Sequence, residues 1–130
     1  MSRPLLPESS WYIKLARNKQ DPLLELALVA ESRTISTCGM VVSEVGRGLK
    51  TKELLEWYTT AWDGMFWIDS STEVWDRTLE LVWTLDRKGI VLPIQDVHIA
   101  ACALEISAVV LTFDNHFKYI PHLKVSDCLY

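Results

Sequence analysis

The chain has 130 residues, 49% of them hydrophobic and 23% charged, a composition that excludes an intrinsically disordered protein. With 13 basic and 17 acidic residues the net charge is −4, which argues against a general binder of polyanions and makes the placement of the acids informative. Three cysteines without C-x-x-C spacing exclude a zinc ribbon and give no support to a disulfide framework.

Neither a secretion signal nor a membrane span is predicted. The segment 1–4 does not open an apolar core of the kind that signal peptides need. The most apolar stretch, 99–113, is too short to cross a bilayer and contains Glu105. Because the chain has no repeat, low-complexity tract or Gly/Ser-rich linker, we expect one domain over residues 1–130, located in the cytoplasm.

The first half of the chain alternates short apolar strands with helices. Leu5 and Leu6 lie between two prolines and make a poor strand by themselves. Ser9 and Ser10 can cap a short helix that reaches about Asn18. Further helices are predicted from 21 to 30, from 40 to about 46 and from 51 to 62, with a buried strand at 34–38 and a second short strand at 66–68.

The second half contains the clearest amphipathic helix. Ser70 and Glu73 predict a capping box for it, and Gly89 ends it. Asp96 stands at the start of a helix rich in small residues, and a buried strand at 109–112 and an edge strand at 123–125 follow. Strands that alternate with helices over long connections predict an α/β fold, in which a parallel sheet is covered on both faces. Ligands of such sheets bind beyond the carboxyl ends of the strands.

Four acids are predicted to face that end of the sheet, namely Glu8, Glu44, Asp96 and Asp114. Carboxylates forced together repel one another, and a hard divalent cation with oxygen ligands removes the conflict. Such an ion lowers the pKa of a water and stabilises charge on a phosphoryl oxygen. The pattern therefore predicts a divalent-metal site suited to phosphodiester hydrolysis.

Each acid also has a purely structural interpretation. Asp96 can be an N-cap, Glu44 a solvated helix residue, Asp114 a turn residue and Glu8 a surface acid in a loop. Their joint placement at one sheet end favours the metal site. Asp96 and His98 lie two residues apart, which on a helix is not a zinc-binding spacing, and His116 has only its proximity to Asp114 in its favour.

Four segments resemble the PIN domain family, in order and over nearly the whole chain. They are Glu8 to Ile13 (ESSWYI), Val42 to Val45 (VSEV), Pro93 to Leu104 (PIQDVHIAACAL) and Leu111 to Phe117 (LTFDNHF) with its continuation Ile120 to Val125 (IPHLKV). The last two segments are the specific ones. The resemblance is to the VapC-like branch, the toxin halves of toxin–antitoxin pairs.

The resemblance implies a three-layer α/β/α fold around a short parallel sheet of four to five strands. It implies an endoribonuclease that uses Mg²⁺ or Mn²⁺, with all four acids catalytic and with Glu8, Asp96 and Asp114 as metal ligands. Ser9 and Thr112 match supporting hydroxyl positions. The resemblance further implies a homodimer and a small antitoxin partner whose C-terminal segment lies along a hydrophobic groove. The aromatic residues that would suit such a groove are Trp11, Tyr12, Trp57 and Trp62.

The main departure from the family is Glu8, where PIN domains have Asp. Its extra methylene shifts the carboxylate, and catalytic positioning is sensitive to shifts of ~1 Å. This leaves a second hypothesis open, a catalytically weakened protein that binds RNA or an antitoxin-like peptide. A phospho-receiver domain is a third, but Glu8 lacks the acidic neighbour that receivers need. Basic residues that lie just beyond Glu8 and Glu44 in the sequence are candidate RNA contacts, namely Lys14, Arg17, Arg47 and Lys50. The alternative is that they belong to solvated helix faces.

Overall fold

The computed structural model describes residues 2–129, which form short parallel strands connected by helices. The strands are β1 (Leu5–Pro7), β2 (Ser36–Cys38), β3 (Phe66–Ile68), β4 (Val109–Leu111) and β5 (Lys124–Ser126). The helices are α1 (Ser9–Arg17), α2 (Pro22–Ala30), α3 (Gly39–Arg47), α4 (Lys52–Asp63), α5 (Thr72–Arg87) and α6 (Ile94–Glu105), with a 3₁₀ turn η1 (Asn115–Tyr119). The predicted α/β class is confirmed.

The strands form two parallel ladders rather than one continuous sheet. One ladder has the order β1-β4-β5 and the other pairs β2 with β3. A parallel bridge between Leu5 and Ile35 joins them, and the hydroxyl of Ser36 donates to the Leu5 carbonyl at 2.7 Å. The five predicted strands are therefore present in the described residues, but the predicted single sheet is divided beside β1.

The first strand, which the sequence presents as weak, lies at the centre of the strand arrangement. The residues that flank β1, Pro4 and Glu8, are also hydrogen-bonded to β4. Val109 N donates to Pro4 O at 2.8 Å, and Glu8 N donates to Leu111 O at 3.0 Å. Pro7 itself ends the strand, so its missing N–H interrupts no ladder. Partner strands thus hold β1 in a conformation that its own sequence disfavours.

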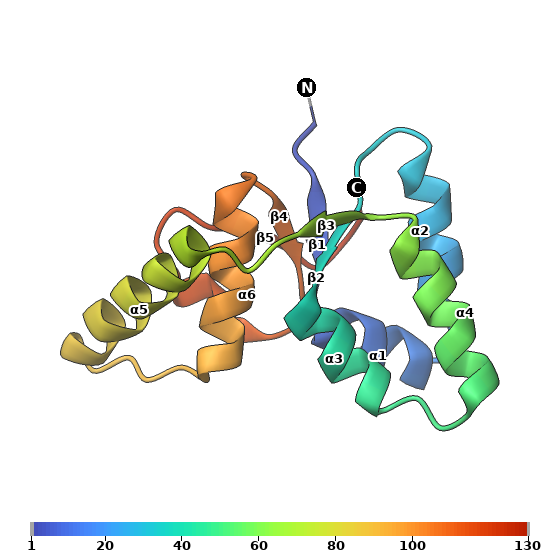
Figure 1. Ribbon diagram of the computed structural model, residues 1–130, viewed down its shortest axis with the longest axis horizontal. Coiled ribbons are helices and arrows are strands. Elements are labelled where there is room, and N and C mark those ends of the chain that lie inside the picture. Colours follow the sequence, from blue (N-terminus) through green and yellow to red (C-terminus); the bar gives the residue numbers. More distant parts are fainter. Residues whose placement is uncertain (1, 130) are drawn as a thin grey trace.

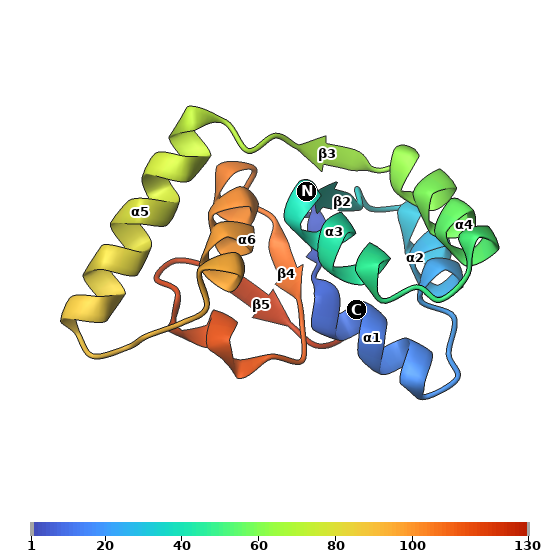
Figure 2. The same cartoon turned by 60° about the horizontal axis from the view of Figure 1, so that its bottom comes forward.

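Helices flank the strands from two sides (Figures 1 and 2). α5 and α6 pack together on one side, while α1 to α4 lie on the other. α6 is buried from Val97 to Ala103, because its alanines and Cys102 allow it to pack closely. No helix within residues 2–129 is long and apolar enough to cross a membrane.

Three of the aromatic residues expected to line a groove belong instead to the core. Trp11, Tyr12 and Trp62 are 2%, 1% and 1% exposed, and Tyr12 and Trp62 meet edge to face with ring centroids 6.3 Å apart. The indole N–H of Trp62 donates to the Tyr12 hydroxyl at 3.3 Å. Large rings are needed here because they fill the space between α1 and α4. Trp57 alone of the four is exposed, at 65%.

Two helix caps differ from the sequence prediction. Glu8, not Ser9 or Ser10, caps α1, because its carboxylate reaches the Ser10 N–H. Ser71 caps α5 by accepting from Val74 N, while the Ser70 hydroxyl lies 2.8 Å from the Nε2 of buried His98. Neighbouring serines offer similar caps in sequence, and tertiary contacts decide between them.

Candidate metal centre

The acids gather where β1 and β4 end. Glu8 follows the last residue of β1, and Thr112 and Asp114 follow β4, whose register places Pro7 opposite Leu111. Since the two strands are parallel, both continuations leave the same edge of the sheet. The bond from Asp114 N to the Thr112 hydroxyl (2.9 Å) turns the chain after β4 back towards Glu8.

Glu8 forms what we call the closed half of the site, together with Ser10 and Thr112. Glu8 is only 2% exposed. Its Oε1 accepts from Ser10 N at 2.8 Å, from the Thr112 hydroxyl at 2.8 Å and from the Ser10 hydroxyl. The Ser10 hydroxyl in turn accepts from Phe113 N at 3.0 Å, which ties the start of α1 to the loop after β4.

Burial dominates the electrostatics of Glu8. Removal from water raises the pKa of the Glu8 carboxyl, against hydrogen bonds from Ser10 and Thr112 that lower it, and the nearby charge of Asp96 raises it further. The carboxylate is therefore unfavourably buried next to a second acid. A cation placed between the two would relieve both causes.

Asp96, Asp114 and His116 form the open half of the site. Asp96 lies in the first turn of α6, which begins at Ile94, so Asp96 is not the N-cap. The Nδ1 of His116 donates to Asp96 Oδ2 at 2.9 Å and lies 3.3 Å from Asp114 Oδ1. The side chains of Asp96, Asp114 and His116 are 15%, 33% and 43% exposed, so solvent and small ligands can reach them.

The pKa values of this half also depart from their ordinary values. Burial raises the pKa of the Asp96 carboxyl, although the hydrogen bond from His116 lowers it. The same hydrogen bond raises the pKa of the His116 imidazole, and the charges of Asp114 and Asp96 add to this. Without a metal, the two aspartates therefore favour the protonated form of His116.

The open half fits a divalent cation. One ligand atom from each of Asp96, Asp114 and His116 lies within 4.8 Å of the others. Within residues 2–129, these three side chains are the set of acidic, histidine and cysteine side chains that lie close enough together to hold a metal ion. Two carboxylate oxygens and one imidazole nitrogen suit Mg²⁺ less well than Mn²⁺, which accepts nitrogen more readily. The donor set therefore supports a metal centre.

Glu44 stands at the border of the site. Its Oε1 accepts from the Ser9 hydroxyl at 2.7 Å, so α3 is bonded to the residue that follows Glu8. It is not in the group of three ligands, but it lines a cavity of about 450 Å³ together with Ile13, Arg17 and Lys50. The supporting hydroxyls predicted at Ser9 and Thr112 each bond to one of the predicted acids.

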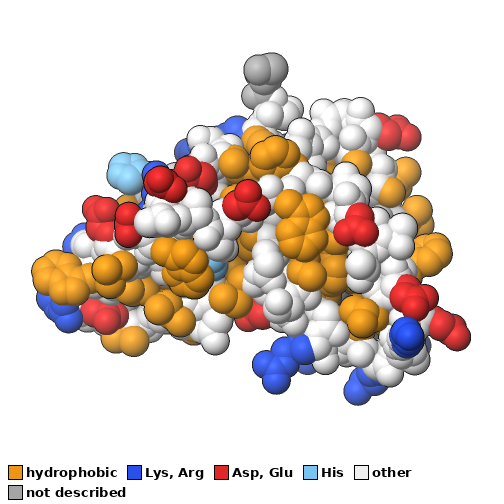
Figure 3. All heavy atoms as spheres, in the orientation of Figure 1, with side chains coloured by type: hydrophobic (Ala, Val, Ile, Leu, Met, Phe, Trp, Pro, Cys, Tyr) orange, Lys and Arg blue, Asp and Glu red, His pale blue; other side chains and the backbone are white. Residues whose placement is uncertain are grey.

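Basic side chains surround this border. The ammonium of Lys14 lies 4.2 Å from the ring centroid of Phe113, next to Asp114. Arg17 and Lys50 share the cavity with Glu44, and Arg47 is exposed at the end of α3. Figure 3 shows Lys and Arg side chains along the lower edge of the molecule, on the side of α1, α3 and the loop to α4.

Two site residues were missed or undervalued in the sequence. Ser10 was considered only as a cap, although its hydroxyl connects Glu8 to Phe113. His116 had only its proximity to Asp114 in its favour, although it contacts both aspartates. The spacing from Asp114 to His116 was the available signal, but the contact with Asp96 depends on how α6 packs against η1.

A comparison with protein families identifies the family to which the chain belongs. A model described as a PIN domain matches residues 6–123, and the chain therefore belongs to the PIN domain family. A search of the curated proteins found no match to this chain.

Solved structures share the fold at low sequence identity. A chain of the VapBC2 complex from Rickettsia felis, bound to a promoter DNA fragment, is 24% identical with a TM-score of 0.78, covering 95% of this chain and 97% of that chain. A chain of DNA-bound VapBC from Salmonella typhimurium is 21% identical with a TM-score of 0.75, covering 96% and 98%. VapC20 from Mycobacterium tuberculosis, described as a toxin that cleaves the sarcin–ricin loop, is 15% identical with a TM-score of 0.60, covering 88% and 92%.

Proposed function

We propose that the chain is a metal-dependent endoribonuclease that hydrolyses RNA phosphodiester bonds, the toxin of a VapBC-type toxin–antitoxin pair, acting in the cytoplasm as a single domain. The observation that carries this proposal is the meeting of Asp96, Asp114 and His116 beside the buried carboxylate of Glu8. An acidic cluster of this kind in a PIN domain suits Mg²⁺ or Mn²⁺ and a phosphodiester substrate.

The side chains divide the work between holding an ion and placing it. Asp96 and Asp114 hold the ion, joined by Glu8 and by the His116 imidazole once it has lost its proton. A bound divalent ion supplies charge stabilisation at a phosphoryl oxygen and a lowered pKa for water. Ser10 and Thr112 fix the direction of the Glu8 carboxylate. Glu44, held by Ser9, is the remaining acid available to accept a proton at the border of the site.

The RNA backbone would approach across the basic border. Lys14, Arg17, Arg47 and Lys50 are exposed and could each contact a phosphate, which reconciles a nucleic-acid substrate with the net charge of −4. Such contacts position a substrate without selecting its sequence. We therefore expect substitution of these residues to weaken binding in a salt-dependent manner.

The antitoxin partner is supported by the fold shared with toxin–antitoxin complexes. The cavity of about 450 Å³ beside Glu44 has apolar walls from Ile13 and Leu49 and basic groups from Arg17 and Lys50. A C-terminal peptide segment with apolar side chains and a terminal carboxylate would fit this combination. Its position beside Glu44 would let the segment obstruct RNA access. The family resemblance also implies that two copies of the chain pair.

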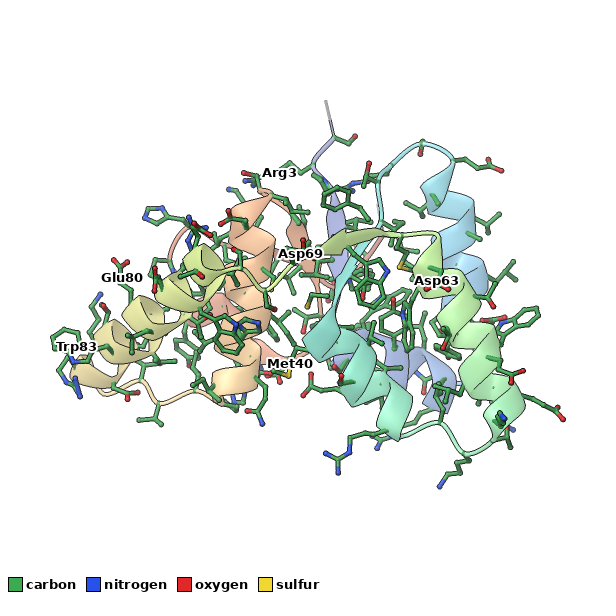
Figure 4. All side chains as sticks on the ribbon, in the orientation of Figure 1. Arg3, Met40, Asp63, Asp69, Glu80 and Trp83 are labelled. Carbon is green, nitrogen blue, oxygen red and sulfur yellow. The ribbon has the colours of Figure 1, made fainter. Side chains whose placement is uncertain are left out.

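The test is RNA cleavage by purified protein with Mn²⁺ or Mg²⁺. We expect cleavage that EDTA abolishes and that Asp96→Asn lowers by roughly 10²-fold or more, because the substitution removes a charged ligand from a site that stabilises developing charge. Asp63→Asn, at the exposed end of α4, is the matched control and should cleave like the wild type (Figure 4). Equal cleavage by wild type and Asp96→Asn would refute the assignment.

A second candidate function is favoured by the closed half of the site. The Oε1 of Glu8 already accepts three hydrogen bonds, and Glu8 stands where PIN domains have Asp. A carboxylate that already accepts these hydrogen bonds could still help to bind the metal ion while placing the ion poorly for cleavage. In that case the chain would bind RNA or an antitoxin-like peptide with little hydrolysis, and the Glu8→Asp variant discussed below separates the two functions.

A further inference from the structure

A cavity of about 390 Å³ adjoins the open half of the site and takes no part in the metal chemistry proposed for it. Asp114 belongs both to the group that could hold a metal ion and to the wall of this cavity. The cavity is at the small end of the range for ligand sites, about 300–1,000 Å³. Its wall combines the loop after β4, η1 and the end of β5, among them Phe113, Asp114, Asn115, Lys118, Ser126 and Asp127. A small ligand in this cavity would therefore lie next to the metal centre.

The sheet holds the β5 wall of the cavity in place. β5 runs parallel to β4 with Ser126 opposite Leu111, so both strands end at the edge where the acids gather (Figure 2). Thr112 N donates to Ser126 O at 2.8 Å. The Ser126 hydroxyl donates to Cys128 O at 2.9 Å and accepts from Cys128 N at 3.2 Å. Asp127 lies between these two bonded residues, so its backbone is positioned before any ligand arrives.

Phe113 gives the cavity an aromatic side chain on a fixed backbone. Its N–H donates to the Ser10 hydroxyl at 3.0 Å, and the Lys14 ammonium lies 4.2 Å from its ring centroid. Single-stranded RNA is recognised through bases that leave their stack and lie on aromatic rings, and such stacking accepts every base. Phe113 therefore offers affinity for a base next to the metal centre without choosing which base.

The charge of Asp127 separates a base from a phosphate. Among residues 2–129, Asp127 is not in the group of side chains close enough together to hold a metal ion. A phosphate between the carboxylates of Asp127 and Asp114 would be repelled by both, whereas a base is uncharged and carries N–H groups that a carboxylate accepts. The cavity is therefore suited to a base, and the basic border of the site to the RNA backbone.

Asp127 and Lys118 together match guanine better than the other bases. The Watson–Crick edge of guanine carries two adjacent N–H donors, which one carboxylate accepts as a pair, and beside them the O6 acceptor. Lys118 is exposed on η1 and offers donors to such an oxygen, and Asn115 adds an amide group to the same wall. Adenine, cytosine and uracil each present one donor group at that edge. Paired recognition by a carboxylate is therefore available to guanine alone.

We propose that this cavity is a base subsite, which receives the nucleobase beside the scissile phosphate and prefers guanine. Phe113 stacks on the base, Asp127 accepts its N1–H and N2–H, and Lys118 donates to its O6. Because Asp114 joins the cavity to the metal centre, this assignment rests on the proposed nuclease function. The base subsite adds sequence preference to a site whose phosphate contacts carry none.

The experiment is single-turnover cleavage with saturating Mn²⁺ of short uridine RNAs that carry one central guanosine, adenosine, cytidine or uridine. Wild type should cleave the guanosine RNA at least ~10-fold faster than the others, the discrimination expected of one good paired contact to a base. Asp127→Asn should reduce this ratio to ~3-fold or less, because an amide offers one acceptor oxygen in place of two. Phe113→Leu should slow all the RNAs together by about 10-fold, because stacking accepts every base.

Asp63→Asn is the matched control for Asp127→Asn, since it makes the same change at an exposed residue outside the cavity, and it should keep the guanine preference. A loss of metal or of folding would slow all the RNAs alike and leave their ratio unchanged. The ratio therefore reports on the base subsite and not on the metal centre.

Binding of guanosine separates the base subsite from cleavage, because guanosine has no phosphate and needs no metal. In ¹H–¹⁵N NMR spectra of the full chain, guanosine should shift the amide signals of Phe113, Asn115 and Asp127 more than cytidine does at the same concentration. Equal cleavage of the RNAs, a guanine preference that survives Asp127→Asn, or guanosine shifts that lie elsewhere would each overturn the base subsite and leave the nuclease standing. Uncleaved RNAs with guanosine still bound in the cavity would instead refute the nuclease and support the base site.

Discussion

The two halves of the site solve the same electrostatic problem in different ways. In the closed half, Glu8 is 2% exposed, and three hydrogen bonds to one of its oxygens offset part of the cost of burying its charge. In the open half, Asp96 and Asp114 remain partly exposed and share one histidine. Hydrogen bonds from hydroxyl and amide groups fix a direction, whereas a histidine can exchange its proton for a metal ion. The closed half is thus the rigid part and the open half the exchangeable part.

This difference separates stability from metal binding. The hydroxyl of Ser10 joins α1 to the loop after β4, so changes in the closed half should affect folding as well as activity. The aspartates of the open half are bonded mainly to His116 and to their own loop. Changes there should affect metal binding with little cost in folding. The predictions that follow test this separation, beginning with the largest effect.

Removal of both aspartates should abolish the response of the protein to metal. Saturating Mn²⁺ at 100 times its dissociation constant stabilises a site by about 2.7 kcal/mol, which corresponds to a rise in melting temperature of roughly 10 °C. Asp96→Asn/Asp114→Asn should show no rise in differential scanning fluorimetry. Without metal the double variant should melt no lower than wild type, because burial raises the pKa of Asp96 and its charge therefore opposes folding at neutral pH.

The control for this experiment is Asp63→Asn, which removes an exposed carboxylate at the end of α4, outside the group of Asp96, Asp114 and His116, and should keep the full response. A double variant that still gains stability with Mn²⁺ would show that the ion binds elsewhere. A double variant that unfolds without metal would show that the open half is structural, contrary to the comparison drawn above.

Shortening Glu8 tests whether the closed half is built for catalysis as it stands. In Glu8→Asp the carboxylate can still cap α1 through Ser10 N, since Asp is a favoured N-cap. It retreats, however, from the Thr112 hydroxyl, which in the wild type lies 2.8 Å from the Glu8 carboxylate. We expect RNA cleavage to fall roughly 10- to 100-fold, in line with a displacement of about 1 Å. An increase in cleavage would instead favour the weakened protein. Single-turnover cleavage with saturating Mn²⁺ distinguishes the two outcomes.

Neighbouring serines offer a matched test of rigidity. Ser10→Ala removes three contacts of the closed half and leaves Phe113 N without its acceptor, so we expect a loss of about 1–3 kcal/mol in unfolding free energy. Ser9→Ala removes a single bond to the half-buried Glu44 and should cost less, about 0.5–1.5 kcal/mol. Urea denaturation measures both. Equal losses would show that Ser10 has no special role in joining α1 to the loop.

The sequence was informative where function depends on local patterns. The order of helices and strands, the parallel α/β class and the acids at strand ends followed from periodicity and from the PIN resemblance. These features are set by a few adjacent residues, so a single sequence contains them.

The remainder depended on contacts between distant segments. β1 looked weak because only its own two leucines and prolines were visible, while its bonds come from Thr34, Val109 and Leu111. Trp11 and Trp62 looked available for a groove because exposure is not encoded in residue type. His116 gained its role through a residue twenty positions earlier, brought near by the packing of α6 on η1. Such contacts are tertiary, and local spacing carries no direct signal of them.

The smallest predicted effect, a pH dependence, concerns His116 as the exchangeable partner of the open half. The hydrogen bond with Asp96 raises the pKa of His116 above its usual 6.5, with the charges of Asp114 and Asp96 adding to it. A raised histidine pKa stabilises the metal-free fold at pH values below 6.5, and this stabilisation is lost as pH rises through the folded pKa.

Metal binding requires the neutral imidazole, so Mn²⁺ affinity should change in the opposite direction and increase a few-fold per pH unit across neutrality. In His116→Asn the affinity should be lower and should depend less on pH in this window, because the imidazole that must lose its proton to bind the ion is gone. Isothermal titration calorimetry with Mn²⁺ at pH values on either side of neutrality measures both slopes. If wild type and His116→Asn showed the same slope, His116 would not be exchanging its proton for the ion, and the open half would have to bind metal through its carboxylates alone.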